Sequence, residues 1–193
     1  MFPLTPRRPG PGHSGALVLL VFAGGSVLDA ILRTTSRYSP AAGMLPQVLL
    51  AAVPMFIAIG AWVCLRSRKD LSGQLLLQLL LGIVIGILAM RSALPLSWYL
   101  GIGLVLWAMR LGLNLLMWVG TSLLVLAAGA QFGMIAYTGV LFLPFVATPV
   151  LFLGAAAYFQ LHQVRHQQQQ EVDPEADRAS ALHRKRYGRE PGQ

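Results

Sequence analysis

Charged side chains are scarce in this sequence and unevenly distributed. They make up 11% of the 193 residues, whereas a soluble domain carries about 25%. Between residues 15 and 160 the only acidic residues are Asp29 and Asp70, and the other five follow Gln170. A soluble domain would need charged side chains over its whole surface. The composition therefore excludes a soluble domain and predicts an integral membrane protein.

Histidine and cysteine are equally scarce. Residues 15–160 contain no histidine, and the whole chain has one cysteine, Cys64. The four histidines lie near the two ends of the chain: His13, His162, His166 and His183. A single cysteine excludes an intrachain disulfide and an all-cysteine metal site, and the apolar region has neither a histidine base nor a pair of acids for catalysis. His162 and His166 are spaced like two metal ligands on a helix, but no third ligand is evident. We therefore expect a non-enzymatic protein with no cofactor or metal.

What the sequence has instead is a series of long apolar runs. Continuous runs near 20 residues favour membrane-spanning helices over the short alternating strands of a membrane barrel. The expected fold is all-α, a polytopic integral membrane helix bundle with about six transmembrane helices. The expected spans are residues 15–32, 46–65, 71–90, 92–109 and 115–131, with a sixth that ends near 160. Residues 1–14 are expected to form a disordered basic tail, and residues 161–193 a polar cytoplasmic tail.

The first span has an alternative interpretation as a signal peptide. Arg7 and Arg8 precede the apolar stretch GALVLLVFAGG, and cleavage after Ala23 or Gly25 would suit small-residue specificity. However, the apolar run continues to Leu32, which is long enough for a signal anchor. The uncleaved span is the interpretation that we favour.

The basic residues predict the orientation in the membrane. The net charge of +8 comes from residues scattered between the spans rather than gathered on one face, so we expect no nucleic-acid partner. Lys and Arg are enriched in cytoplasmic loops. With six spans, residues 7–8, the cluster at 66–70 and the C-terminal tail fall on one side, while Arg33, Arg37 and Arg91 fall on the other. We therefore expect both termini to be cytoplasmic.

The stretch WAMRLGLNLLMW, residues 107–118, places Arg110 and Asn114 in otherwise apolar sequence. In one placement the chain turns at residues 109–114, where glycine and asparagine tolerate unusual backbone angles, and Trp107 lies at the membrane interface. In the other, one helix runs through the stretch and Arg110 is buried, which costs about 2.5–3.5 kcal/mol without a partner. Asp29 and Asp70 are both poorly placed to pair with it. The sequence favours the turn.

Three polar residues inside the predicted spans are candidates for a functional role. Asp29 is the only acid within a span, and intramembrane acids often mark proton or cation paths. It also lies one helical turn from Arg33, which predicts a simple ion pair. Gln74 and Gln78 share one helix face and are candidates either for a polar pathway or for hydrogen bonds that pack neighbouring helices. We favour the structural role for each.

Other motifs indicate packing and surface contacts. Gly82 and Gly86 fit the small-xxx-small pattern that lets helices approach closely, and Gly129 with Gly133 fits it more weakly because a loop is expected there. Prolines in the second and last spans are expected to kink them. The basic cluster Arg184, Lys185 and Arg186 is a candidate for contact with anionic lipid headgroups.

Two functions remain compatible with these observations. Few ionisable groups are available for a substrate or a coupling ion, which favours an accessory or scaffold subunit of a membrane assembly over a small transporter or channel, alone or as a homo-oligomer. A water-filled cavity that reaches Gln74 and Gln78 would favour transport. The expected partners are membrane lipids and other membrane proteins or further copies of the chain. Thirteen arginines against two lysines point to a GC-rich bacterial gene, and hence to a bacterial cytoplasmic (inner) membrane.

Overall fold

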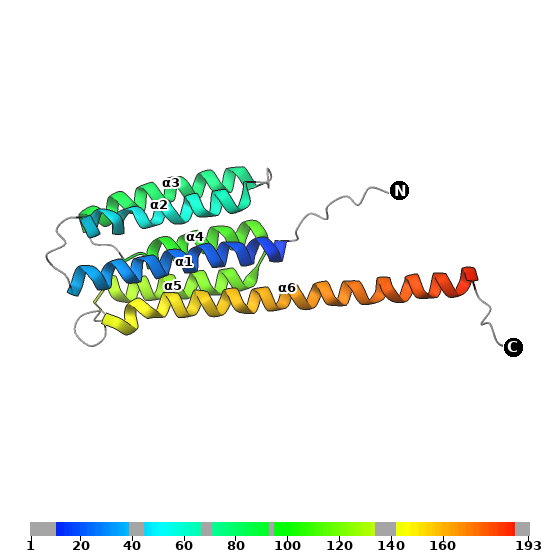
Figure 1. Cartoon of the computed structure of the whole chain (residues 1–193). Helices are drawn as coiled ribbons and strands as arrows, with labels where there is room; N and C mark the ends of the chain where they lie inside the picture. Colours follow the sequence, from blue (N-terminus) through cyan, green and yellow to red (C-terminus); the bar gives the residue numbers. More distant parts are fainter. Residues whose placement is uncertain (1–10, 39–44, 67–70, 93–94, 134–141, 188–193) are drawn as a thin grey trace.

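The described residues of the chain fold into helices alone. The computed structural model describes residues 11–38, 45–66, 71–92, 95–133 and 142–187. Within these ranges the chain forms six helices: α1 (Pro11–Tyr38), α2 (Leu45–Leu65), α3 (Ser72–Ser92), α4 (Ser97–Leu111), α5 (Asn114–Gln131) and α6 (Phe142–Tyr187). The predicted all-α fold is confirmed (Figure 1).

Most of these helices have the length and composition of membrane spans. Five of them, α1, α2, α3, α5 and α6, contain apolar stretches of at least 18 residues. The fourth, α4, has only 15 residues, or about 22 Å at 1.5 Å per residue, which is shorter than the hydrocarbon core of about 30 Å. The chain is a helical membrane bundle in which α4 is the short member.

Successive helices run antiparallel, so the connections alternate between the two ends of the bundle (Figure 1). One end holds the start of α1, the α2–α3 connection at Arg66 and the α4–α5 turn; we call it the Arg66 end. The other end contains the last residues of α1 and the first residues of α6, and we call it the Tyr38 end. The helices lie in three layers, α2 with α3, α1 with α4, and α5 with α6 (Figure 1), and α1 packs against α2, α4 and α6.

The first helix is longer at both ends than the predicted span. It begins at Pro11 and continues to Tyr38, so the expectation of a loop at Arg33 and Arg37 is wrong. The hydroxyls of Thr34, Thr35 and Ser36 each donate a hydrogen bond to the backbone carbonyl four residues earlier, at 2.7–2.8 Å. Such bonds satisfy hydroxyls within a helix, and the polar segment therefore extends α1 instead of ending it.

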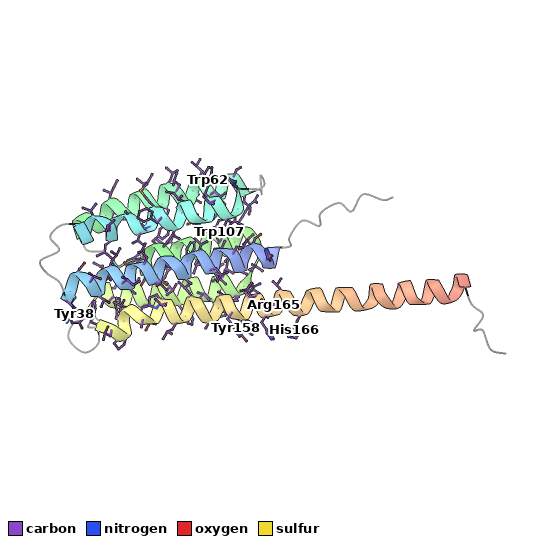
Figure 2. All side chains as sticks on the ribbon, viewed as in Figure 1. Tyr38, Trp62, Trp107, Tyr158, Arg165 and His166 are labelled. Carbon is purple, nitrogen blue, oxygen red and sulfur yellow. The ribbon has the colours of Figure 1, made fainter. Side chains whose placement is uncertain are left out.

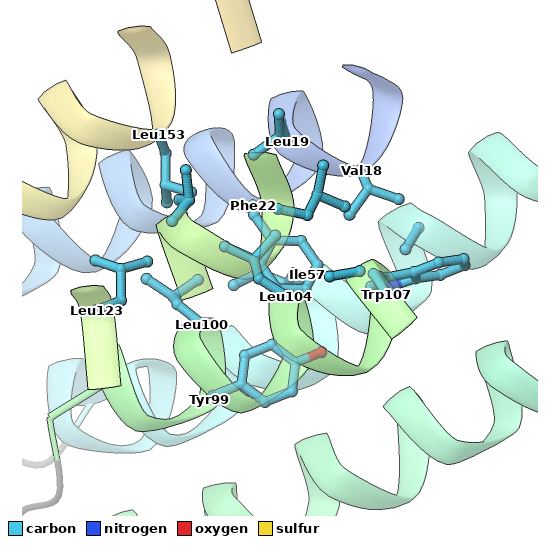
Figure 3. Packing of buried hydrophobic residues seen from close by; sticks show 14 of the residues in the cluster. Val18, Leu19, Phe22, Ile57, Tyr99, Leu100, Leu104, Trp107, Leu123 and Leu153 are labelled. Atoms are coloured by element: carbon cyan, nitrogen blue, oxygen red, sulfur yellow. The ribbon is translucent and has the colours of Figure 1, made fainter. Parts of the chain in front are cut away.

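The hydrophobic core includes residues from all six helices, and its two largest fully buried side chains, Trp107 and Tyr99, belong to α4 (Figure 3). Phe22 of α1 stacks on Tyr99 of α4, with ring centroids 5.9 Å apart and planes 12° apart. Leu104 and Trp107 of α4 and Ile57 of α2 are almost completely buried beside them. Aromatic stacking of this kind adds to the burial of the rings, so this contact fixes α4 against α1.

Two glycines of α3 bring this helix into backbone contact with α2. A Cβ atom at Gly82 would lie 3.1 Å from the carbonyl oxygen of Pro54, and one at Gly86 would lie 2.7 Å from that of Ala51. Both glycines of α3 therefore face α2, in the way that small-xxx-small packing requires. The other predicted pair, Gly129 and Gly133, does not lie on one helix. Gly129 belongs to α5, whereas Gly133 follows the end of that helix and has a φ of 70°.

The last helix is far longer than a membrane span. It has 46 residues, or about 69 Å at 1.5 Å per residue, and continues past the predicted limit near residue 160. Pro144 lies in the first turn of α6. Backbone N–H groups in a first turn have no carbonyl acceptor within the helix, so the proline does not interrupt the helix. The residues after His166 project beyond all the other helices at the Arg66 end (Figure 1).

Candidate functional site

The two glutamines of α3 lie where this helix meets α4. The side chain of Gln78 is 1% exposed, and its Nε2 donates a 3.0 Å hydrogen bond to the backbone carbonyl oxygen of Gly103. A Cβ atom at Gly103 would lie 3.0 Å from Gln78 Oε1. The Gln78 amide therefore fits between α3 and α4 because residue 103 has no side chain. Gln74 lies one helical turn away on the same face, closer to the Arg66 end.

Several buried polar atoms on the faces of α3 and α4 that carry Gln78 and Gly103 have no hydrogen-bond partner among the described residues. They are Gln74 Nε2, Gln78 Oε1, Tyr99 Oη and Trp107 Nε1. We call these four residues the α3–α4 seam. Because α3 and α4 are antiparallel and Gln78 faces Gly103, Trp107 and Gln74 both lie one turn toward the Arg66 end. Each unsatisfied buried group costs about 1–3 kcal/mol, so the seam is the least satisfied part of the core.

Trp107 departs from the position predicted for it. An interfacial indole was expected, but its side chain is completely buried within the core (Figure 3). The reason is that α4 lies in the middle layer, so the face that carries Trp107 is covered by other helices instead of lipid. The exposed indole at the α4–α5 turn is that of Trp118, which is 73% exposed.

Asp29 pairs with Arg33 as its position suggests. Arg33 Nε donates a 2.8 Å hydrogen bond to Asp29 Oδ2 within α1, whereas Asp29 Oδ1 is buried and has no partner among the described residues. A cavity of about 10 Å³ lined by both residues, by Ser26 and by Ser97 lies beside the carboxylate. That volume suits about one water molecule. The site is therefore a small cavity near the Tyr38 end, with four polar residues among its mostly apolar lining.

The second arginine at the Tyr38 end also has a partner. The guanidinium carbon of Arg37 lies 4.4 Å from the centroid of the Phe142 ring at the start of α6, which is a cation–π geometry. Arg33 and Arg37 are thus both engaged by groups of the bundle itself.

Arg110 and Asn114 flank a tight turn. α4 ends at Leu111, and Gly112 adopts a left-handed conformation with φ 65°. The backbone N–H groups of Gly112 and Leu113 both donate to the carbonyl oxygen of Ala108, at 2.8 and 3.2 Å, which closes the helix as glycine caps do. The side chains of Arg110 and Asn114 are both exposed. Of the two placements, the chain adopts the turn.

The remaining candidates lie on α6. His162 and His166 face each other with their Nε2 atoms 3.3 Å apart, yet no group of three or more metal-ligating side chains occurs among the described residues. Residues 184–186 belong to the last turns of the helix. They are about 27 Å from His166 along its axis, and their contact with lipid headgroups stays a prediction.

Comparison with protein-family models, with curated proteins and with solved structures finds no match to this chain.

A pair of glycines that was not predicted from the sequence packs α4 against α5. A Cβ atom at Gly101 of α4 would lie 3.0 Å from the carbonyl oxygen of Gly120 in α5, and the converse distance is also 3.0 Å. The sequence does contain a signal for this contact, because Ser97 and Gly101 are four residues apart and fit the small-xxx-small pattern. This pair closes the α4–α5 hairpin.

Proposed function

We propose that the chain is a non-enzymatic accessory or scaffold subunit of a membrane protein assembly, located in a bacterial cytoplasmic membrane with both termini in the cytoplasm. The observation that carries the proposal is the extension of α6. Residues 167–187 continue the helix beyond the bundle for about 30 Å. This additional length is not required to cross a membrane. A helix that extends outside the membrane provides a surface to which a partner protein can bind.

The charge pattern of the extension supports a docking role. Four acidic residues alternate between positions 171 and 177, and basic residues dominate from Arg178 to Arg186. Charges of opposite sign thus occupy separate blocks of one helix. Separated blocks give a partner both an orientation and a register, because complementary charges on the partner match in only one direction.

The buried glutamines point the same way. Gln78 is held by its bond to Gly103. Two cavities bounded by described residues, one beside Asp29 and one between α2 and α3, are lined by neither Gln74 nor Gln78. An amide fixed between packed helices contributes to the cohesion of the bundle. A packing role at the seam supports a structural subunit.

Affinity purification tests the proposal directly. The full chain and a variant truncated after His166, each with an N-terminal tag, are purified from membranes in mild detergent. We expect a second membrane protein to accompany the full chain in stoichiometric amount and to be absent from the truncated chain. Equal membrane levels of the two forms are the control. Recovery of the full chain alone, or an unchanged partner on the truncated chain, would contradict the proposal.

A small transporter or channel is the second candidate, and it is favoured by the unpartnered atoms of the α3–α4 seam, in contrast to the Gln78–Gly103 bond. Four buried polar atoms without partners are costly in a dry core, and a route that fills with water would satisfy them. The test introduces Gln78→Cys into a Cys64→Ser background and measures labelling by a membrane-impermeant maleimide in inside-out membrane vesicles, with Arg110→Cys, which is exposed at the Arg66 end, as the accessible control. Labelling at position 78 supports transport, and protection there supports the packing role.

A further inference from the structure

A groove on the outer face of the bundle runs between α2 and α3 at the Arg66 end. It has a volume of about 560 Å³, within the range of small-molecule sites. Its lining is apolar except for one serine and comprises Ala58, Ile59, Trp62, Ser72, Leu75, Leu76 and Leu79. Trp62, 55% exposed, marks it in Figure 2.

The extent of the groove distinguishes between possible occupants. Along α3 it reaches from Ser72 to Leu79, about 10 Å at 1.5 Å per residue, or roughly a third of the hydrocarbon thickness. A helix of another protein would pack along the whole α2–α3 surface. A lipid chain that enters from the headgroup region at the Arg66 end needs only this short segment.

The charge at the mouth of the groove indicates what kind of lipid would fit. Arg66 follows Trp62 by one helical turn, directly after the end of α2, and its side chain is exposed. None of the seven groove residues is acidic. In sequence, Arg68, Lys69 and Asp70 follow in the segment that lies outside the described residues, so residues 66–70 together are net positive. A cationic group beside an apolar groove at the membrane interface suits an anionic phospholipid.

We propose that the groove binds one acyl chain of an anionic phospholipid, whose phosphate contacts Arg66. The acyl chain is surrounded by hydrocarbon both in the bilayer and in the groove, so the headgroup determines the selectivity. One arginine near the membrane surface contributes about fivefold in binding preference, the equivalent of about 1 kcal/mol. This inference does not depend on which protein partner the chain has.

Quenching of Trp62 by brominated lipids measures occupancy of the groove. The full chain and a Trp62→Phe variant are reconstituted into phosphatidylcholine vesicles that contain increasing fractions of brominated phosphatidylglycerol or brominated phosphatidylcholine. The difference between the two proteins isolates the fluorescence of Trp62. We expect brominated phosphatidylglycerol to quench half of the Trp62 fluorescence at an about fivefold lower fraction than brominated phosphatidylcholine does. At 0.5 M NaCl the two lipids should differ less, because salt screens the contact between Arg66 and the headgroup.

Two further variants separate the groove from the general surface charge. Arg66→Gln is expected to abolish the preference for brominated phosphatidylglycerol. Arg165→Gln, which removes an exposed arginine of α6 at the same end of the bundle, is expected to preserve it. Equal quenching by both lipids, or a preference that survives Arg66→Gln, would overturn the proposal. Absence of quenching by either lipid would also overturn it, because the groove would then be covered by protein. The circular dichroism spectrum of each variant verifies that it is folded.

Discussion

Substituting the glycines of α3 with alanine should destabilise the bundle in proportion to how closely α2 approaches each one. At Gly86 a Cβ atom would lie 2.7 Å from the carbonyl oxygen of Ala51, and at Gly82 3.1 Å from that of Pro54. Both neighbours are backbone atoms and cannot rotate away as a side chain could. The helices must therefore separate along this contact.

The size of the effect follows from two opposing contributions. Alanine is favoured over glycine in a helix by up to about 1 kcal/mol, and overpacking costs about 1–3 kcal/mol. Gly154 of α6 provides the matched control, because a Cβ atom there would meet no atom within 4 Å. We expect Gly86→Ala to be less stable than Gly154→Ala by about 1–3 kcal/mol, with Gly82→Ala between them.

Unfolding in mixed micelles provides the measurement. Each purified variant is titrated from a mild detergent into sodium dodecyl sulfate, and the loss of helical structure is followed by circular dichroism. The order of midpoints should be Gly154→Ala highest, then Gly82→Ala, then Gly86→Ala. Equal midpoints for Gly86→Ala and Gly154→Ala would refute the conclusion that α2 and α3 are held in backbone contact at Gly86.

Three other predictions concern the ion pair, the turn and the orientation. In a double-mutant cycle, Asp29→Asn and Arg33→Gln should show a coupling of about 0.5–3 kcal/mol in the same unfolding titration; additive effects would mean that the 2.8 Å contact contributes nothing. Gly112→Ala should lower stability by about 1–2 kcal/mol because a side chain is strained at φ 65°, and no loss would indicate that the turn rearranges. Reporter fusions after Arg37 should read as external and fusions after Arg66 as cytoplasmic, and the reverse pattern would contradict the proposed orientation.

The fold was predictable because apolar run length and charge placement are local properties of the sequence. The limits predicted for the second, third and fifth helices lie within two residues of those observed, since charged residues or a proline mark the ends of the second and third and glycines flank the fifth. The α4–α5 turn was also predictable, because Gly112 can adopt the left-handed conformation that closes the hairpin. These features depend on a few neighbouring residues.

The errors arise where packing between distant helices decides the outcome. Trp107 is a plausible interface residue by sequence, and only the central position of α4 explains its burial. The pairing of Gln78 with Gly103 joins residues 25 positions apart, and no periodicity in α3 or α4 specifies that register. The polar end of α1 has the composition of a loop, because arginine and threonine are common in solvent-exposed segments, whereas the hydrogen bonds of Arg33 and Thr34 within the helix extend α1.

The contact between the first and the last helix has a consequence for how the protein is made. α1 packs against α6, and a Cβ atom at Gly12 would lie 3.1 Å from a side-chain atom of Val164. During synthesis α1 emerges first and remains without this partner until more than 120 further residues have been added. The bundle is therefore completed only after α6 has been synthesised. Until then one side of α1 lacks its protein partner and is open to lipid or to other membrane proteins.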